Sequence, residues 1–188
     1  MFEAYSVVEA LYYILKKIGK ADKIKLTKLI YLADKYHLMK YGRTITGDKY
    51  YAMPQGPVGS LALDVLNKEG YSLTEEEINY SEKLIKSIDK YNYKAGEKDK
   101  VELKYLSDSD IEVLDKICAK FGWWSSWDLK EYTHKYPEWA KNEELLKSEV
   151  ARRKKINTEE LFSKIDNQID IEDDHIEDVK RFFIGNYD

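Results

Sequence analysis

Residues 25–66 read KLTKLIYLADKYHLMKYGRTITGDKYYAMPQGPVGSLALDVL, and this stretch decides the fold of the chain. Its first part carries one stripe of side chains at the period of an α-helix: Leu26, Leu29, Ile30, Ala33 and His37. Gly42 follows where a helix commonly ends on a left-handed residue. The pattern therefore predicts a buried helix that stops at Gly42.

The second part of the stretch predicts a strand and a tight turn. Tyr50–Met53 has the composition of a strand, bounded by Thr46–Asp48 before it and a proline after it. Pro57 fixes its own φ and biases Gly56 away from the helical region. We expect a turn over Gln55–Val58 and then a return to helix. Because no catalytic group lies in this turn, the favoured interpretation is a structural scaffold.

Two blocks of this sequence resemble the Panacea domain, the family of antitoxins related to SocA. The first block is KLIYLADKYHLMKYG, GDKYYAM and QGPVGS; the second is LKEYTH at 129–134 with PEW at 137–139, similar to L-x-x-x-T-H with a nearby P-W. Gln55 departs from the pattern, since an aromatic residue often stands there, and Glu138 separates Pro137 from Trp139. The blocks frame about residues 6–160. The resemblance implies structural roles for Lys28, Leu29, Tyr31, Gly56, Pro57, Val58, Thr133, His134 and Trp139.

The resemblance also implies a function. Members of this family neutralise a cognate protein toxin, commonly by direct binding and without catalysis, and many are associated with phages. The same domain is paired with unrelated toxins, so the resemblance does not name the partner. An alternative within the same class is a proteolysis adaptor that delivers the bound toxin to a protease.

Length and composition indicate one globular domain, or one domain with an appendage, over residues 1–188. The chain is 43% hydrophobic and 35% charged, which is usual for such a domain. No apolar run is long enough to span a membrane, and the N-terminus lacks the basic start of a signal peptide. Cys118 is the only cysteine, which excludes an internal disulfide and fits a reducing compartment. We expect a cytoplasmic protein with no membrane partner.

The charge is distributed unevenly along the chain. The net charge is −4 overall, whereas residues 1–70 carry +4 and residues 157–188, an acidic helical extension, carry −7. Two basic runs, Lys16–Lys28 and Arg152–Lys155, raise the alternative of a nucleic-acid-binding transcriptional regulator. The first run lacks arginine and aromatic side chains that would read bases, so nucleic acid is not the expected partner.

The expected fold is mainly α: a compact set of helices with a few short strands, around residues 43–53 and 91–104. Capping boxes at Ser6–Glu9 and Thr74–Glu77, and a capping signal at Ser107–Asp110, predict helix starts. Residues 91–104 alternate like two strands joined around Gly96, which predicts a β-hairpin. The segment that begins at Asn142 is predicted to be helical and mostly charged, including its basic end.

The sequence offers no sign of catalysis, metal binding or a cofactor. It contains no phosphate-binding loop, dinucleotide fingerprint or nucleophile elbow. Cys118 lies on the apolar stripe of a predicted helix, and His37 lies on another, so both are expected in the core. A dyad of Cys118 with His134 is conceivable, but a histidine that satisfies a backbone group or caps its helix is favoured for His134.

The partner-binding surface is expected around the strand at 50–53 and the aromatic run WWSSW at 123–127. Side chains alternate along a strand, so one face of it meets the helices and the other remains for a partner. Tryptophan and tyrosine are frequent interface anchors. The predicted binding residues are Tyr50, Tyr51, Met53, Gln55, Trp123, Trp124 and Trp127.

Overall fold

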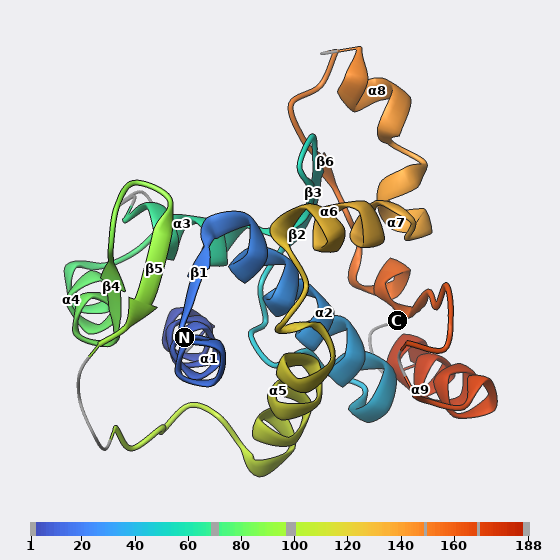
Figure 1. Ribbon diagram of the computed structural model, residues 1–188. Helices are drawn as coiled ribbons and strands as arrows, with labels where there is room; N and C mark the ends of the chain where they lie inside the picture. The colour runs from blue at the N-terminus through green and yellow to red at the C-terminus, as the bar shows by residue number, and fades with distance from the viewer. Residues whose placement is uncertain (1–2, 69–71, 97–100, 149, 169, 186–188) are drawn as a thin grey trace.

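The computed structural model describes residues 3–68, 72–96, 101–148, 150–168 and 170–185. The prediction of a mainly α-helical fold with a few short strands is confirmed (Figure 1). Helix α2 (Lys23–Tyr41) runs through the middle, and it is packed by α1 (Glu3–Ile18), α5 (Asp108–Phe121), α6 (Ser126–His134) and α9 (Asp173–Gly185). The fold is therefore built around the helix that opens the quoted stretch.

Helix α2 ends where its sequence predicts, and its start is defined by a cap. Asp22 caps its start by accepting a hydrogen bond from the backbone N–H of Lys25 at 3.0 Å. Gly42 ends it with φ of 75°, and its N–H donates to the carbonyl of Leu38. The helix is buried on nearly all sides rather than on one stripe, so several polar side chains lie in the core.

Helix α1 starts earlier than the sequence predicts. It begins at Glu3, so the capping box predicted at Ser6–Glu9 is wrong. The Glu9 carboxylate is fully buried and accepts hydrogen bonds from the backbone N–H groups of Lys104 and Tyr105 at 2.9 and 2.8 Å. The Glu9 carboxylate therefore binds a segment far along the chain instead of capping its own helix. The capping signals before α4 (Glu75–Leu84) and α5 are confirmed as capping boxes.

The first sheet differs from the predicted hairpin. Strand β5 (Asn92–Ala95) pairs antiparallel with β4 (Ile85–Ser87) before it and with β1 (Lys20–Asp22), in the order β1-β5-β4. Residues 101–104 form no strand, so a hairpin around Gly96 is wrong. The turn lies instead before β5, where the Asp89 carboxylate accepts from the N–H groups of Tyr91 and Asn92.

The second sheet holds the glycine-proline motif. Strand β2 (Tyr50–Met53) pairs antiparallel with β3 (Gly56–Gly59), and Met53 lies opposite Gly56. Gly-Pro-Val is therefore strand, and the turn lies at Pro54 and Gln55, one step earlier than predicted. The third strand, β6 (Lys154–Lys155), pairs with the other edge of β2. The helix predicted from Asn142 accordingly ends early, as α8 (Glu143–Lys147).

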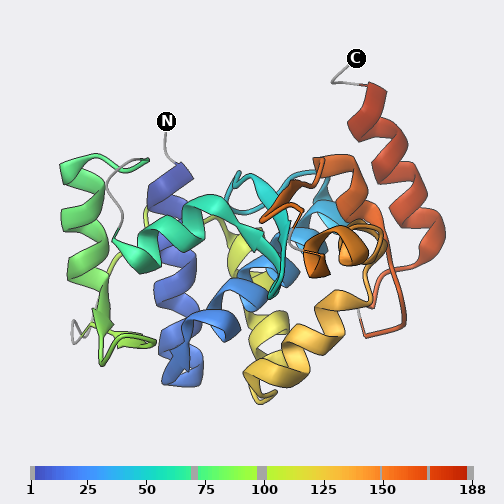
Figure 2. The same cartoon turned by 90° about the horizontal axis from the view of Figure 1, so that it is seen from above.

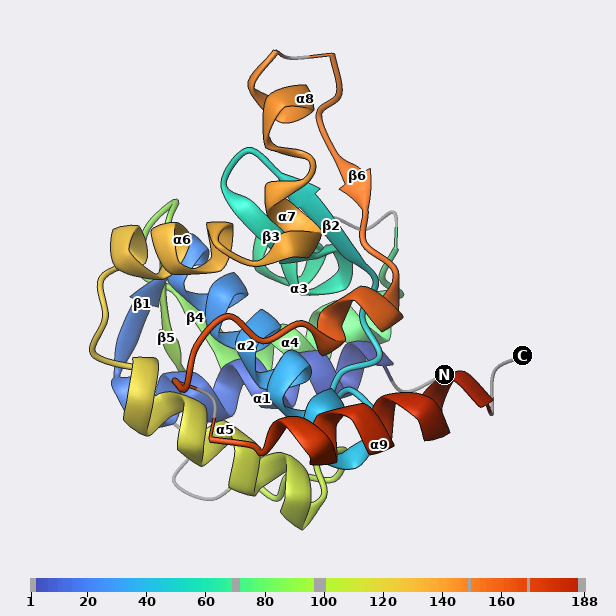
Figure 3. The same ribbon diagram turned by 90° about the vertical axis from the view of Figure 1, so that its right-hand side faces the viewer.

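The remaining elements connect these layers. Helix α3 (Ser60–Asn67) follows β3, α7 (Pro137–Ala140) follows α6, and the 3-10 helix η1 (Thr158–Phe162) follows β6. Figure 2 shows α4 at one end of the molecule and α9 at the other. Figure 3 shows the β2–β3 hairpin, β6 and α8 rising from the helical body. No helix within the described residues could span a membrane.

Candidate functional site

A buried lysine joins the β2–β3 hairpin to α2. The side chain of Lys28 is fully buried, and its Nζ donates a hydrogen bond to the carbonyl of Pro57 at 2.7 Å. Gly56 has φ of +103°, and a Cβ there would lie 2.9 Å from Nζ of Lys28. Burial, with a smaller contribution from Lys130, lowers the pKa of Lys28 to about 7. The positive φ favours a glycine here whatever the space, and a Cβ would in addition displace the end of the buried lysine side chain.

His134 and Trp139 form the second contact with the hairpin. Their rings stack with centroids 3.5 Å apart and an angle of 10° between planes. Trp139 donates from Nε1 to the carbonyl of Met53 at 2.8 Å. Burial first, then the charges of Lys130 and Lys28, lowers the pKa of His134 to about 4. The backbone of Gln55 acts on this pKa weakly in the opposite direction, and the expectation that His134 satisfies a backbone group stays a prediction.

A small cavity opens beside this histidine. It has a volume of about 270 Å³ and lies between α6, α7, α8 and the hairpin turn. Nε2 of His134 is buried and has no hydrogen-bond partner. The lining residues are Pro54, Lys130, Glu131, His134, Trp139, Glu143, Leu146 and Lys147. The two family-like sequence blocks thus meet at one place, the tip of the hairpin.

A buried ion pair lies in the core next to Trp139, the residue that binds the hairpin. Lys35 Nζ lies 2.7 Å from Glu138 Oε1, and both side chains are fully buried. Tyr31 donates to the same oxygen at 2.6 Å, and Ser163 donates to Oε2 at 2.6 Å. Lys35 also donates to the carbonyl of Leu161 at 2.8 Å. The network ties α2, α7 and η1 together.

Sequence reasoning missed this network. It treated Glu138 only as a departure from the family pattern, and it gave Lys35 no role. No local signal marks either residue, because the pairing joins positions 103 residues apart. Lys35 is one of several charged residues on α2, so its charge alone does not show that it is buried and requires a partner.

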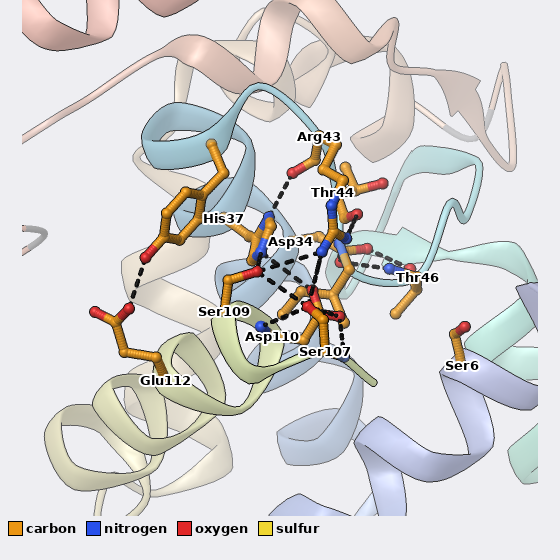
Figure 4. Close-up of polar contacts among 12 residues, drawn as sticks. Ser6, Asp34, His37, Arg43, Thr44, Thr46, Ser107, Ser109, Asp110 and Glu112 are labelled. Carbon is orange, nitrogen blue, oxygen red and sulfur yellow. Dashed lines mark hydrogen bonds and ion pairs between the residues drawn. The ribbon is translucent and has the colours of Figure 1, made fainter. Parts of the chain in front are cut away.

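A second buried carboxylate shapes the loop before the hairpin (Figure 4). Asp34 accepts from the N–H groups of Ile45 and Thr46 at 2.8 and 3.0 Å, and from the hydroxyl of Tyr50 at 2.7 Å. Asp48 accepts from the N–H groups that open α3. These bonds set the path by which the chain leaves α2 and enters β2.

His37 lies in a polar cluster with Arg43 and Asp110 (Figure 4). Its Nδ1 lies 2.8 Å from the carbonyl of Arg43, and its Nε2 lies 3.1 Å from Asp110 Oδ1. Arg43 reaches the same carboxylate at 2.9 Å. Burial alone would raise the pKa of Asp110, but the close contact with His37, hydrogen bonds from Ser107 and the charge of Arg43 together lower this pKa to about 2. His37 is buried, as predicted, and it anchors the start of α5.

The predicted partner-binding residues fall into three environments. Tyr50 is only 3% exposed and faces the core, so its assignment to the binding surface is corrected. Tyr51 and Met53 lie on the outer face of β2, half-buried, and Gln55 is exposed in the turn. Of the tryptophans, Trp124 packs against Phe121 and Tyr132 and is half-buried, while two are exposed: Trp123, 88%, and Trp127, 65%.

Trp127 connects to the hairpin along α6, and Trp123 is exposed in the segment before that helix. Nζ of Lys130 lies 4.6 Å from the centre of the Trp127 ring. Lys130 also lines the cavity whose other wall contains Pro54. Tyr51 carries the guanidinium of Arg153 at 4.8 Å on its outer face. We call Trp123, Trp127, Lys130, Pro54 and Gln55 the outer strip.

The two basic runs differ in exposure. In the first, Lys28 is buried and Lys17 pairs with Asp115 at 2.8 Å, so this run is not a continuous cationic face. In the second, Arg152–Lys155 is exposed on the segment that ends in β6. The assignment of Lys28 to a nucleic-acid surface is therefore wrong, since it cannot reach a phosphate.

The chemistry of the remaining candidates is simple. Cys118 is buried, as predicted, and burial raises the pKa of its thiol to about 12. The thiol therefore stays protonated at neutral pH, which disfavours a nucleophilic role. Within the described ranges, no group of three or more His, Cys, Asp or Glu side chains could hold a metal ion.

The fold and this site define a class: a mainly α-helical protein whose β-hairpin is held by a buried lysine and a histidine–tryptophan stack. The family model described as Antitoxin SocA-like, Panacea domain, matches residues 26–140. Because the match covers more than half of the 188 residues, the chain belongs to this family. The matched range includes Lys28, the β2–β3 hairpin, His134 and Trp139. No curated protein and no solved structure matches the chain.

The buried lysine predicts a dependence of stability on pH. The pKa of Lys28 is about 7 in the folded protein, whereas a lysine exposed to water in the unfolded chain has a pKa of 10.5. Between pH 7 and 10.5 the unfolded chain therefore binds more protons than the folded protein. Folding stability should therefore rise with pH in this window, by up to ~1.4 kcal/mol per pH unit. Urea unfolding at pH 7, 8 and 9 measures the slope. The same series on Lys28→Met, with one titrating lysine fewer, should give a flatter slope. Equal slopes would contradict the assignment.

Proposed function

We propose that this chain is an antitoxin that neutralises a cognate protein toxin by direct binding, without catalysis. Membership of the antitoxin-like family supports the toxin as partner. The observation that carries the proposal is the exposure of Trp123 and Trp127 on the outer strip, 88% and 65%. Large aromatic side chains left this open are typical of interface anchors.

The outer strip has the anatomy of a binding surface. Trp127 at the start of α6 and Trp123 before that helix offer apolar area, and Lys130, which contacts Trp127, adds a charge. The cavity beside His134 offers a recess of about 270 Å³ for one partner side chain. Tyr51 and Met53, on the outer face of β2, extend the surface. Charged and apolar groups are combined here as they are in protein–protein interfaces.

Co-expression tests the proposal directly. The reading frame next to this gene should inhibit growth when expressed alone, and this protein should restore growth and co-purify with the frame's product. If growth is restored, the two proteins co-purify and the amount of toxin does not fall, the result supports neutralisation by binding. Rescue with loss of the toxin in a protease-dependent manner would indicate the proteolysis adaptor. Rescue without any complex would contradict direct binding.

Alanine variants of the tryptophans should separate binding from folding. Trp123→Ala and Trp127→Ala remove exposed side chains, so the melting temperature should stay nearly unchanged. Toxin affinity should fall by about 30-fold or more, since truncating an anchor typically costs at least ~2 kcal/mol. Calorimetry of the purified pair measures both quantities.

Two controls accompany these variants. Tyr91→Ala removes an aromatic ring that is also exposed, 60%, but lies in the β4–β5 turn, and should leave affinity unchanged. Trp124→Ala removes a packed ring and should lower the melting temperature. If Trp123→Ala and Trp127→Ala bind toxin like the original protein, the outer strip is not the interface.

The nucleic-acid alternative retains only the second basic run. Arg152–Lys155 is exposed, but Arg153 lies over Tyr51 and the run is short. Non-specific contacts by a few lysines weaken strongly with salt. We therefore assign these residues to the rim of the protein interface, and we place the protein in the cytoplasm, a reducing compartment that fits its single cysteine.

A further inference from the structure

Three tyrosine rings gather at the end of the molecule away from α9, where α1 and α4 lie side by side (Figure 2). Tyr5 stacks on Tyr105 with ring centroids 4.8 Å apart. Tyr80 meets Tyr5 edge-on at 5.1 Å and Tyr105 edge-on at 6.2 Å. The three rings come from α1, α4 and the segment before α5, and all are half-buried. They form a cluster with one side open to solvent.

The open side of this cluster is a cavity with acidic walls. Its volume is about 560 Å³, and besides the three rings its lining consists of Glu75, Glu76, Asn79 and Lys83. Glu75 and Glu76 are exposed in the first turn of α4, and neither makes an ion pair within the described residues. The charges of Glu76 and Glu77 add to desolvation in raising the pKa of Tyr5. Two carboxylates and one ammonium group therefore belong to the residues that line the cavity.

A buried carboxylate holds two of the rings in place. Glu9 is fully buried, and its Oε1 accepts the hydroxyl hydrogen of Tyr80 at 2.6 Å. The same carboxylate accepts the backbone N–H groups of Lys104 and Tyr105. The positions of Tyr80 and Tyr105 are thus set by the core before any ligand arrives. Preorganised rings reduce the ordering cost of binding.

We propose that this cavity, the tyrosine cavity, binds a lysine or arginine side chain of a basic protein partner. The faces of tyrosine rings attract cations, and Glu75 and Glu76 supply opposite charge at the rim. An anionic group would be repelled by the same carboxylates. An uncharged apolar group would bury them without giving them a partner, which is unfavourable.

Lys83 gives the tyrosine cavity an internal test. Lys83 lines the same cavity as the two glutamates, and its charge should repel an incoming cation. Removing its charge should therefore strengthen binding, whereas removing the charges of Glu75 and Glu76 should weaken it. A cavity that bound a ligand by apolar contact alone would respond to neither change. These opposite responses distinguish electrostatic recognition from non-specific apolar binding.

The experiment uses the full chain labelled with ¹³C in its tyrosine rings. It is titrated with the pentapeptide amide Gly-Gly-Arg-Gly-Gly, and the control peptide carries citrulline, which has the same shape without charge. We expect saturable shifts of the Tyr5, Tyr80 and Tyr105 resonances with the arginine peptide only. Glu75→Gln/Glu76→Gln should weaken binding roughly tenfold, and Lys83→Gln should strengthen it several-fold.

Each outcome decides the matter. Equal shifts with the citrulline peptide, or unchanged affinity in the glutamine double variant, would overturn the proposal. So would a linear, non-saturating response at millimolar peptide. All three substitutions lie on the exposed face of α4, so melting temperatures near that of the original protein should accompany them. Trp127→Ala should leave the tyrosine shifts unchanged, so this result stands apart from the toxin-binding surface whichever way that test ends.

Discussion

Replacing Lys35 by methionine is expected to lower the free energy of unfolding by about 3–5 kcal/mol. The reason is the partner that remains. Glu138 is fully buried, and without Lys35 its carboxylate would be an uncompensated charge, held only by Tyr31 and Ser163. The carbonyl of Leu161 would also lose its donor. Chemical denaturation of the purified variant measures the effect.

Two further variants serve as controls for the loss of stability in Lys35→Met. In Lys35→Met/Glu138→Met the buried charge is gone, so much of the lost stability should return, because apolar replacement of a buried pair is often tolerated. Lys147→Met breaks an exposed pair with Glu143 and should change stability by less than ~1 kcal/mol. If Lys35→Met is no worse than Lys147→Met, the buried pair does not hold α7 and η1 to α2.

Replacing Gly56 by valine is expected to lower the free energy of unfolding by about 3–5 kcal/mol, from two sources. The φ of +103° is strained for any residue with a Cβ. A Cβ would also lie 2.9 Å from Nζ of Lys28 and 3.2 Å from Cδ2 of His134. Both side chains hold the hairpin, so the turn at Pro54 and Gln55 should shift and toxin binding should fall with stability. Urea unfolding and toxin affinity measure the two effects.

Gly19 provides the matched control. It also has positive φ, +85°, but a Cβ there meets nothing within 4 Å. Gly19→Val should therefore show the backbone strain alone, about 1–3 kcal/mol. The difference between the two variants reports the collision with Lys28 and His134. Equal losses would mean that these side chains move aside without cost and that the hairpin is not tightly held.

Much of the fold was accessible from local sequence signals. The stripe of Leu26 to His37, with Gly42 after it, predicts the central helix, and the capping signals of Thr74 and Ser107 predict two further helix starts. Each of these depends on residues a few positions apart, whose interactions form whenever the local backbone does. The family-like blocks also led to the region where Lys28, His134 and Trp139 meet the hairpin.

The errors concern contacts between distant segments. Glu9 was assigned to a local cap, but residues 104 and 105 take its carboxylate. The basic segment Arg152–Lys155 is predicted to be helical, but Lys154 and Lys155 form a strand that pairs with the open edge of β2. Tyr50 and Tyr51 could not be told apart as inner and outer until the helices covered one face. Alternation along a strand leaves the choice of buried face to the neighbours.

The sequence by itself determined the mainly helical class, the central helix with its end at Gly42, and the residues that the family shares. Only the tertiary structure decided that Lys35 pairs with Glu138, that Lys28 lies beneath Gly56, and that Trp123 and Trp127 remain exposed. The physical reason is distance along the chain. A helix period or a cap is a relation between near neighbours, whereas burial of a charge or exposure of a ring depends on which remote segment covers it.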